Sequence, residues 1–283
     1  MGGLGNQLFQ IFATISCAMD ANTKFYFFNI EKLGEGINGC TVRPTYWNNF
    51  LIRMRIFLRP LTHSLPVMKI VRENGFHYTE LPVNKITAEN KDIMLHGYFQ
   101  SYKYFEKNFN AIYNIIGIEN MKKKIHKKMF ISNSFFDKTI SVHFRIGDYK
   151  LLQDYHPIAK YEYYKNALNH IQNINKDIFY TILYFCENID IDDVNIIINQ
   201  LKESFPNFTF LRVGDYLQDW EQMLLMSSCE HNIIANSSFS WWGAYFNINN
   251  SKIVCYPAKW FGDKANTSST VDLCPPEWIK ITE

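Results

Sequence analysis

The sequence predicts an α/β fold with mainly parallel sheets, because segments with strand and helix patterns alternate along its 283 residues. The alternation is most regular in the second half, where short apolar runs are separated by amphipathic segments of helical length. Hydrophobic residues make up 47% and charged residues 20% of the chain, which is typical of a soluble globular protein. The length is sufficient for one large domain or two modest ones.

The first half begins with a glycine-rich turn at Gly2–Gln7, followed by a predicted helix to Asp20 and a strand at Lys24–Phe28. A strand normally leads into such a turn, so either the fold begins at the turn or a first strand of the N-terminal domain is missing. The other elements predicted here are a mixed helix near 47–58, short strands near 77–81 and 92–96, and helices at 103–116 and 119–129.

Polar residues 132–134 predict a loop between two domains. We place an N-terminal domain at 1–131 and a C-terminal domain at 132–283, whose terminal segment is free to pack back on the first domain. The second half predicts strands at 139–143, 178–185, 208–212, 232–235 and 252–255, with helices at 161–174, 191–203 and 217–228.

A last helix, rich in aromatic residues, is predicted after the strand 232–235. We expect Ser237 or Ser238 to cap it. At the carboxyl end of a parallel strand, the free N–H groups and the positive dipole end of such a helix form a natural phosphate site. Trp241 and Trp242 are expected to pack the helix rather than contact a ligand.

Composition limits the partners and the location of the protein. The net charge of +2 is too small to indicate a nucleic-acid partner, and we interpret the lysine cluster at 122–128 as a solvated helix face or a connector. The six cysteines lack pairing or metal spacing, which favours buried free thiols in a reducing compartment. No apolar run approaches the roughly 20 residues of a membrane span. We therefore expect a cytoplasmic protein, with membrane association only through an acceptor or a partner, and a membrane or Golgi-type location only if an N-terminal segment is missing.

The segment His143–Tyr149 is a candidate ligand-binding site at the end of the predicted strand 139–143. Ligands of open α/β sheets gather at strand ends, and arginine offers a charged fork that matches phosphate oxygens, so we expect Arg145 to face a ligand. His143 would bind the ligand or orient a neighbour, and Asp148 would hold Arg145 or accept a proton. The alternative is a strand-end turn with an internal ion pair.

Two other patterns suggest ligand sites less specifically. The turn at Gly2–Gln7 is similar to a phosphate-cradling loop, but it matches neither the Walker A nor the dinucleotide pattern, and it places the amides of Asn6 and Gln7 at a helix start. The D-x-D at Asp190–Asp192 begins a predicted helix, where acidic residues favour the dipole. The histidines lack ligand spacing, so we expect no metal and no other cofactor.

Three stretches, in this order, resemble the signature regions of the α-1,2-fucosyltransferases of glycosyltransferase family 11. They are Gly2–Gln7 (G-G-L-G-N-Q), His143–Tyr149 (H-F-R-I-G-D-Y) and Ser237–Trp242 (S-S-F-S-W-W). Residues 97–105 are similar to the family's mid-chain motif, and 219–221 to its acidic-aromatic helix start. The resemblance covers essentially the whole chain.

The resemblance implies a GT-B fold of two Rossmann-like domains that face each other across a cleft. It makes 1–131 the acceptor-side domain and 132–283 the GDP-sugar-binding domain. It implies inverting, metal-independent transfer of L-fucose from GDP-β-L-fucose to the 2-hydroxyl of a galactoside glycan. The residues that it assigns to the donor are Gly5, His143, Arg145, Asp219, Ser237, Ser238 and Phe239. It assigns Arg145, Asp148 and Asn6 to catalysis, with Asn6 near the leaving group or acceptor.

Two departures bear on these expectations. The family motif usually has two adjacent arginines, whereas Ile146 follows Arg145 here. If the second arginine stabilises the transition state as a donor, its loss costs about 2–4 kcal/mol. The alternative is that this arginine is structural, because successive strand residues point to opposite sides. A missing first strand would affect the stability of the N-terminal sheet more than the chemistry.

Asp148 and Glu221 are both candidates for the base. The alternative functions are glycosyl transfer by the same fold with another donor or acceptor, and nucleotide-sugar binding by an inactive protein.

Overall fold

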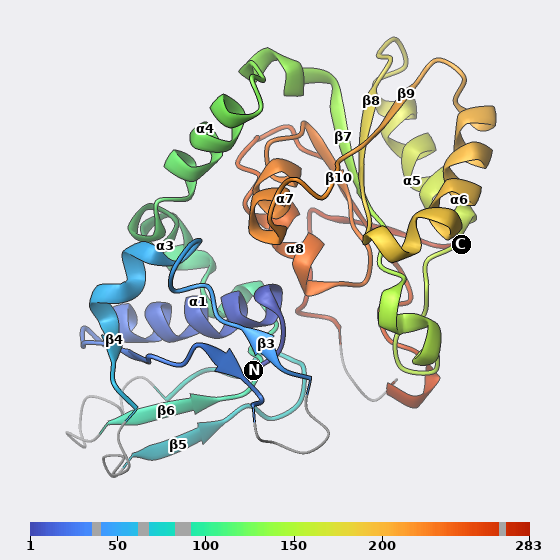
Figure 1. Ribbon diagram of the computed structural model, residues 1–283. Helices are drawn as coiled ribbons and strands as arrows, with labels where there is room; N and C mark the ends of the chain where they lie inside the picture. Colours follow the sequence, from blue (N-terminus) through green and yellow to red (C-terminus); the bar gives the residue numbers. More distant parts are fainter. Residues whose placement is uncertain (36–40, 62–67, 83–91, 266–269) are drawn as a thin grey trace. The chain divides into compact units, whose positions relative to one another are not determined.

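The computed structural model describes residues 1–35, 41–61, 68–82, 92–265 and 270–283. Contacts divide the chain into two compact units, formed by residues 1–119 with 268–275 and by residues 120–267 with 276–283. This division falls inside helix α4 (Ile118–Lys128), ahead of the expected boundary at 131/132. The predicted α/β class is confirmed, since parallel strands alternate with helices along the chain (Figure 1).

The second unit is built on a six-stranded parallel sheet in the order β12-β11-β10-β7-β8-β9. Its strands are β7 (Thr139–His143), β8 (Thr181–Phe185), β9 (Thr209–Arg212), β10 (His231–Ile233), β11 (Val254–Pro257) and β12 (Ile279–Ile281). The chain proceeds outward from β7 to β9 and then returns to the other side of β7 at β10. The order therefore reverses between β7 and β10, which is where open α/β sheets bind ligands.

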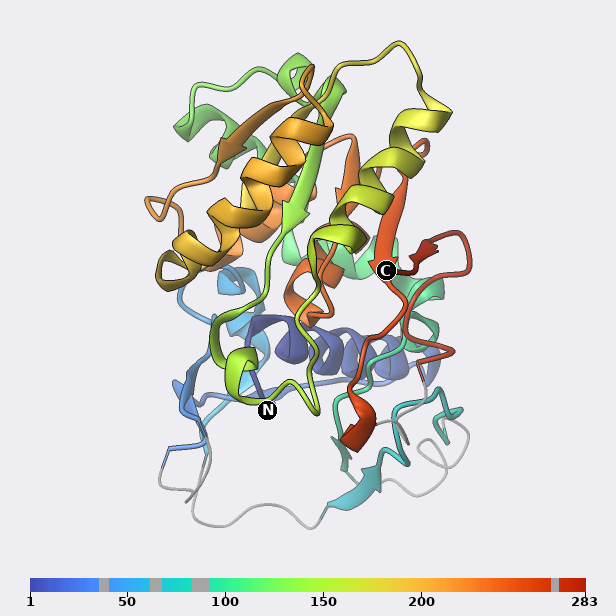
Figure 2. The same cartoon turned by 90° about the vertical axis from the view of Figure 1, so that its right-hand side faces the viewer.

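Two layers of helices cover this sheet. Helices α5 (Tyr161–Ile174) and α6 (Ile191–Ser204) lie side by side on one face (Figure 2). Helices α7 (Asp219–Met226) and α8 (Ser238–Tyr245) lie on the other (Figure 1). All five residues of β7 are buried, because both faces of the sheet are covered. The predicted bounds of β7 and α5 agree with those observed.

The first unit contains helix α1 (Leu4–Asp20), helix α3 (Phe109–Ile116) and three pairs of short strands. Two pairs are parallel, β1 (Phe27–Phe28) with β4 (Leu58–Arg59) and β5 (Lys69–Arg72) with β6 (Ile93–His96). The third is antiparallel, β2 (Lys32–Leu33) with β3 (Arg43–Pro44). Among the described residues of both units, 3₁₀ turns lie at Ile52–Phe57, Tyr102–Tyr104, Glu106–Asn108, Asn133–Lys138, Gly147–Leu151, Asn188–Asp190 and Asp263–Ala265.

The strand predicted at 77–81 is wrong. The N–H of Tyr78 donates to a carboxylate oxygen of Asp272 over 3.1 Å, and the N–H of Thr79 donates to the hydroxyl of Tyr104 over 3.1 Å. Side chains thus satisfy backbone groups that a strand partner would otherwise satisfy. Strands β5 and β12 were not predicted.

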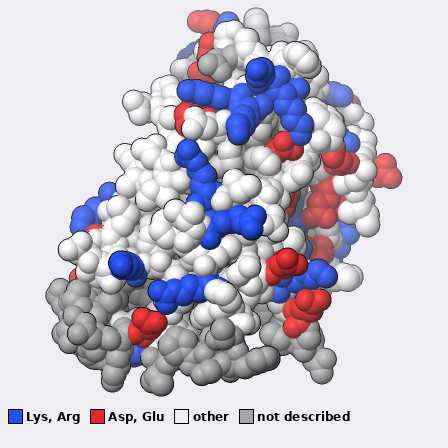
Figure 3. Space-filling model, turned by 60° about the vertical axis from the view of Figure 1, so that its left-hand side comes forward, with Lys and Arg blue, Asp and Glu red and all other residues white. Residues whose placement is uncertain are grey.

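Helix α4 carries the lysine cluster at 122–128. Lys123, Lys124 and Lys127 are exposed, as a solvated helix face requires. Lys122 departs from this interpretation, because it is buried and its ammonium donates to the carbonyl of Ser227 over 3.0 Å. Figure 3 shows that the Lys and Arg side chains on one face of the molecule form several groups with uncharged surface between them.

The described cysteines are Cys17, Cys186, Cys229, Cys255 and Cys274, and all five are free and buried, as predicted. Cys40 lies outside the described residues. Within the part of the chain that the structure describes, no helix combines the length and the apolar character needed to cross a membrane.

Asn232, in the middle of β10, is the centre of a buried polar network. Its amide nitrogen donates to the hydroxyl of Ser141 over 2.7 Å and to the carbonyl of Met226 over 2.8 Å. Its amide oxygen accepts from Asn247 over 2.8 Å, and Asn247 also donates to the carbonyl of Cys229 over 2.8 Å. The network therefore ties β10 to β7 and to the segments that follow α7 and α8.

We expect Asn232→Ala to lower the free energy of unfolding by about 3 kcal/mol, because each buried polar group left unpaired costs about 1–3 kcal/mol. Urea unfolding followed by tryptophan fluorescence measures this change, since of the six tryptophans only Trp47 lies in the first unit. The control is Asn195→Ala on the exposed side of α6, which should change stability by less than about 0.5 kcal/mol. Equal effects of the two substitutions would contradict the assigned role of Asn232.

Candidate functional site

The carboxyl ends of β7, β8 and β10 meet at one edge of the second unit's sheet, because these strands are parallel neighbours. His143 is the last residue of β7, and Arg145 follows two residues later. The N–H of Phe144 donates to the carbonyl of Phe185 over 2.8 Å, which continues the pairing with β8 past the end of β7. Arg145 therefore extends from backbone that the sheet holds in place.

Arg145 forms ion pairs with two carboxylates. One is Asp148, three residues later, and the other is Glu187, which follows β8. The guanidinium also lies over the ring of Tyr149, 5.1 Å from its centroid. The expected ion pair within the turn, with Asp148, is thus present, and a second one with Glu187 accompanies it. Of the Arg145 side chain, 22% stays exposed to solvent. Solvent exposure leaves the guanidinium accessible to an anionic ligand.

The turn after Arg145 is fastened to the start of α6. Gly147 has a positive φ of 28°, and its N–H donates to a carboxylate oxygen of Asp190 over 2.7 Å. Lys150 pairs with Asp193 over 2.7 Å. The D-x-D segment therefore begins a helix, as predicted, and its first aspartate supports the arginine turn. In the described ranges, no cluster of three or more His, Cys, Asp or Glu side chains is arranged to hold a metal ion.

His143 is a buried, neutral imidazole beside the arginine. Burial, and to a smaller degree the charge of Arg145, lowers its pKa to about 3. Its ring lies against that of Phe239, with centroids 5.5 Å apart. Its Nδ1 atom is buried and has no hydrogen-bond partner among the described residues. A buried nitrogen of this kind is costly unless a ligand or water pairs with it.

The N-terminus of α8 follows β10 directly. Ser237 is the N-cap, as predicted, and its hydroxyl accepts the N–H of Phe239 over 3.3 Å. Asn236 anchors this turn by donating to the carbonyls of Pro157 over 2.9 Å and of Trp260 over 3.0 Å. Trp241 and Trp242 are fully buried, which confirms their expected packing role. Ser238 and Phe239, the first residues of α8, are each partly exposed.

Asp219 and Glu221 lie in the first turn of α7, which packs against α8. A carboxylate oxygen of Asp219 accepts the N–H of Trp220 over 2.7 Å. Glu221 is buried and completes a capping box by accepting the N–H of Gln218 over 2.9 Å. It also accepts from the ammonium of Lys128 over 2.7 Å. These contacts give Glu221 a structural role, so Asp148 is the more accessible of the two candidate bases.

Comparison with known proteins identifies the family. The model of glycosyl transferase family 11 matches residues 43–282. The chain belongs to glycosyltransferase family 11. It is 30% identical to the O-antigen biosynthesis glycosyltransferase WbnK of Escherichia coli, over 99% of this chain and 98% of that protein. It is 25% identical to an α-1,2-colitosyltransferase of Escherichia coli, over 99% and 96% of the two chains. It is also 23% identical to a galactoside 2-α-L-fucosyltransferase of Caenorhabditis elegans, over 99% of this chain and 77% of that protein.

In this family 11 chain, Ile146 occupies the place of the usual second arginine. Ile146 is buried and belongs to the hydrophobic cluster between the sheet and α5 and α6. Its side chain therefore points into the core rather than toward Arg145. A second arginine on the same sheet edge is Arg212, at the end of β9, where it pairs with Asp215 over 3.2 Å.

The glycine-rich start of the chain, in the first unit, has its own polar arrangement. Gly2 has a φ of 77°, and a Cβ atom there would approach the side chain of Asn6 to 2.5 Å, so glycine is required on both counts. Gly5 is buried within α1. The amide oxygen of Asn6 accepts from Gln100 over 2.8 Å, which joins the first motif to the mid-chain motif.

The structure thus brings together His143, Arg145, Asp148 and Phe239, with the capped start of α8 on the neighbouring strand. Within the second unit it adds Glu187, Asn236 and Arg212, which the sequence alone did not indicate as site residues. Glu187, Asn236 and Arg212 follow or end parallel strands. Their polar character at strand ends was therefore the available signal.

We expect the imidazole of His143 to remain neutral at pH 5, because its pKa in the folded protein lies near 3, below the ordinary 6.5. Below pH 6.5 the unfolded chain binds a proton that the folded protein does not, so His143 lowers the stability as the pH falls from 6.5 toward 3. Histidine ¹⁵N chemical shifts measured between pH 4 and 8, with His143→Gln for assignment, test this. A titration midpoint near 6.5 would contradict it.

Proposed function

We propose that the protein transfers L-fucose from GDP-β-L-fucose to the 2-hydroxyl of a galactoside, with inversion at the anomeric carbon and without a metal ion. The observation that carries the proposal is the position of Arg145 at the end of β7, beside the capped N-terminus of α8 at the end of β10. Cationic and N–H donors at neighbouring strand ends are suited to a diphosphate. The related galactoside fucosyltransferase supports the choice of sugar and acceptor.

In this proposal, Arg145 binds the diphosphate together with Ser237, Ser238 and the first N–H groups of α8. To do so, the guanidinium shares or exchanges its bonds to Asp148 and Glu187. The neutral His143 contributes its unpaired Nδ1 to a hydrogen bond with the donor. Charge that develops on the leaving GDP is then stabilised by donors that are already oriented.

The proposed reaction is a single displacement. The acceptor oxygen bonds to the anomeric carbon from the face opposite GDP, and the bond from that carbon to the phosphate oxygen breaks. The hydroxyl proton passes to a base, for which Asp148 is the candidate, and GDP leaves with the electron pair of the broken bond. Weak assistance from the base is sufficient if the anomeric carbon is oxocarbenium-like in the transition state. Asp219 would lie near the nucleotide, and Gly5 and Asn6 would serve the leaving group or the acceptor.

A second candidate differs in the donor sugar. The similarity to an α-1,2-colitosyltransferase, over nearly the whole of both chains, favours a colitosyl donor as the alternative. Parallel reactions with GDP-fucose and a colitosyl donor on the same β-galactoside distinguish the two. Donor binding by calorimetry without transfer or hydrolysis would instead identify an inactive binding protein. Full activity in EDTA is the result expected for metal-independent transfer.

We expect Arg145→Ala to lower kcat/KM for GDP-fucose by about 100- to 1,000-fold, because it removes a donor to the leaving diphosphate. Arg145→Lys should recover only part of this loss, since an ammonium keeps the charge but lacks the planar fork. Initial rates of fucosyl transfer, with the product identified by mass spectrometry, measure both.

The control is Lys202→Ala, which removes an exposed cation from α6 in the same unit and should leave kcat/KM unchanged. Wild-type activity of Arg145→Ala would exclude the proposed role of the arginine. Transfer that depends strictly on added metal would contradict the proposed mechanism.

A further inference from the structure

A histidine that the proposed reaction does not use lies at the same edge of the second unit's sheet as Arg145. His156 belongs to the loop between the turn Gly147–Leu151 and α5, and its side chain is partly exposed. Its ring stacks on that of Tyr149, with centroids 4.8 Å apart and planes inclined by 18°, and the ring of Phe261 lies 6.0 Å away. Because neighbouring rings pack against the imidazole, its edge, which carries both nitrogens, is the part left for a ligand.

Two contacts tie this histidine to both halves of the proposed donor site. Tyr149, on which the imidazole stacks, also has the guanidinium of Arg145 over its ring, 5.1 Å from the centroid. Its hydroxyl donates to the carbonyl of Asn236 over 3.2 Å, and the amide of Asn236 donates to the carbonyl of Pro157 over 2.9 Å. Asn236 directly precedes the cap of α8. His156 is therefore held beside the arginine turn and beside the start of that helix.

The loop that carries His156 is fixed by a second loop. The N–H of His156 donates to the carbonyl of Leu152 over 2.7 Å. The N–H of Gly262 donates to the carbonyl of Tyr155 over 2.8 Å, and a Cβ atom at Gly262 would approach the carbonyl oxygen of Asp154 to 2.2 Å. Glycine thus permits the close approach of the two loops. The imidazole is positioned before a substrate arrives, which favours a role in catalysis.

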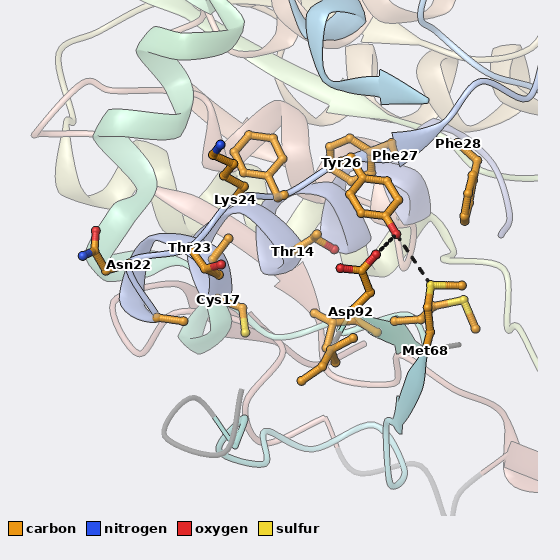
Figure 4. Close-up of a pocket in the computed structure, with 16 residues that line it drawn as sticks. Thr14, Cys17, Asn22, Thr23, Lys24, Tyr26, Phe27, Phe28, Met68 and Asp92 are labelled. Carbon is orange, nitrogen blue, oxygen red and sulfur yellow. Dashed lines mark hydrogen bonds between the residues drawn. The ribbon is translucent and has the colours of Figure 1, made fainter. Parts of the chain in front are cut away.

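The ring nitrogens of His156 are available to a ligand. Among the residues that the structure describes, no hydrogen bond reaches either of them. The cavity of about 560 Å³ in the first unit, lined by α1, β1 and β6, differs in this respect (Figure 4). There the hydroxyl of Tyr26 donates to a carboxylate oxygen of Asp92 over 2.8 Å. Burial raises the pKa of the Cys17 thiol in the cavity wall to about 11. These groups are paired or protonated, whereas His156 keeps a free lone pair.

The charges around His156 suit a neutral base. Burial lowers the pKa of its imidazole, the carboxylate of Asp148 raises that pKa, and the guanidinium of Arg145 lowers it. The phenol of Tyr149 is neutral, since burial raises its pKa. Charged side chains elsewhere in the two loops form ion pairs with each other, namely Lys264–Asp154 and Lys259–Asp263. The ring is therefore neutral at pH 7, and a diphosphate that takes up the charge of Arg145 would strengthen it as a base.

We propose that His156 is the general base of the transfer and accepts the proton of the attacking acceptor hydroxyl. The oxygen of that hydroxyl bonds to the anomeric carbon, its proton passes to an imidazole nitrogen, and GDP leaves with the electron pair of the broken bond. The carboxylate of Asp148 stabilises the imidazolium, which releases its proton to solvent at the exposed edge. Asp148 then keeps the other role expected for it, which is to hold Arg145. The inference rests on the proposed function and names its base.

The test compares His156→Gln with the wild type on a β-galactoside at saturating GDP-fucose, between pH 5 and 9. We expect kcat/KM for the acceptor to fall about 100-fold at pH 7.5, because a positioned base contributes a factor of about 10²–10⁴. In the wild type kcat/KM should decline toward low pH as the imidazole gains a proton, and in the variant this decline should disappear. The affinity for GDP-fucose, measured by calorimetry, should stay unchanged.

Three further variants separate a base from a structural residue. His156→Ala leaves room for a small molecule, so added imidazole should restore part of its transfer activity but none of that lost in His156→Gln. His170→Gln changes a partly exposed histidine of α5 in the same unit and should behave as the wild type. Asp148→Asn should keep the decline of kcat/KM toward low pH, although its rate is lower.

The outcomes distinguish the base from the reaction itself. A wild type that transfers no fucose would overturn the proposed function and the role of His156 with it. An active wild type beside an equally active His156→Gln variant would overturn the role of His156 alone. A decline toward low pH that persists in His156→Gln, or that is lost only in Asp148→Asn, would overturn that role as well.

Discussion

The common direction of the six strands in the second unit is the constraint on which its site depends. Parallel strands need crossover connections, so every strand ends at the same edge and every helix starts from that edge. The reversal of strand order between β7 and β10 then leaves Arg145 and the N-terminus of α8 as neighbours, although 92 residues separate Arg145 from Ser237. Glu187 reaches the same place for the same reason, from the end of β8. The positions of these groups therefore follow from topology before any specific contact is considered.

The parts that could be predicted from the sequence are those with a strong local pattern. The apolar run of β7 and the periodic spacing of α5 define both elements within the sequence itself. Ser237 combines a residue type suited to capping with a position between an apolar run and a helical segment, so its role was predictable too. The resemblance to the family's motifs predicted the candidate site residues as one set, in order along the chain. No single pattern in the sequence predicted that set.

The rest depends on partners that are distant in sequence. Whether Arg145 pairs with one carboxylate or two depends on Glu187, which only the sheet register brings close. The segment at 77–81 has the composition of a strand, but Asp272 and Tyr104 take its hydrogen bonds. The strands of the first unit are only two to four residues long, so they carry little pattern. Tertiary context decides each of these cases.

The two tryptophans of α8 give the second unit an optical reporter. Trp241 lies two residues after Phe239, and its N–H donates to the carbonyl of the capping Ser237 over 3.0 Å. Their rings meet nearly edge to face, with centroids 5.1 Å apart and planes inclined by 73°. Two such chromophores couple electronically, and their circular dichroism in the near ultraviolet depends on their relative orientation. A change in the geometry of the helix start would thus be visible in solution without any added label.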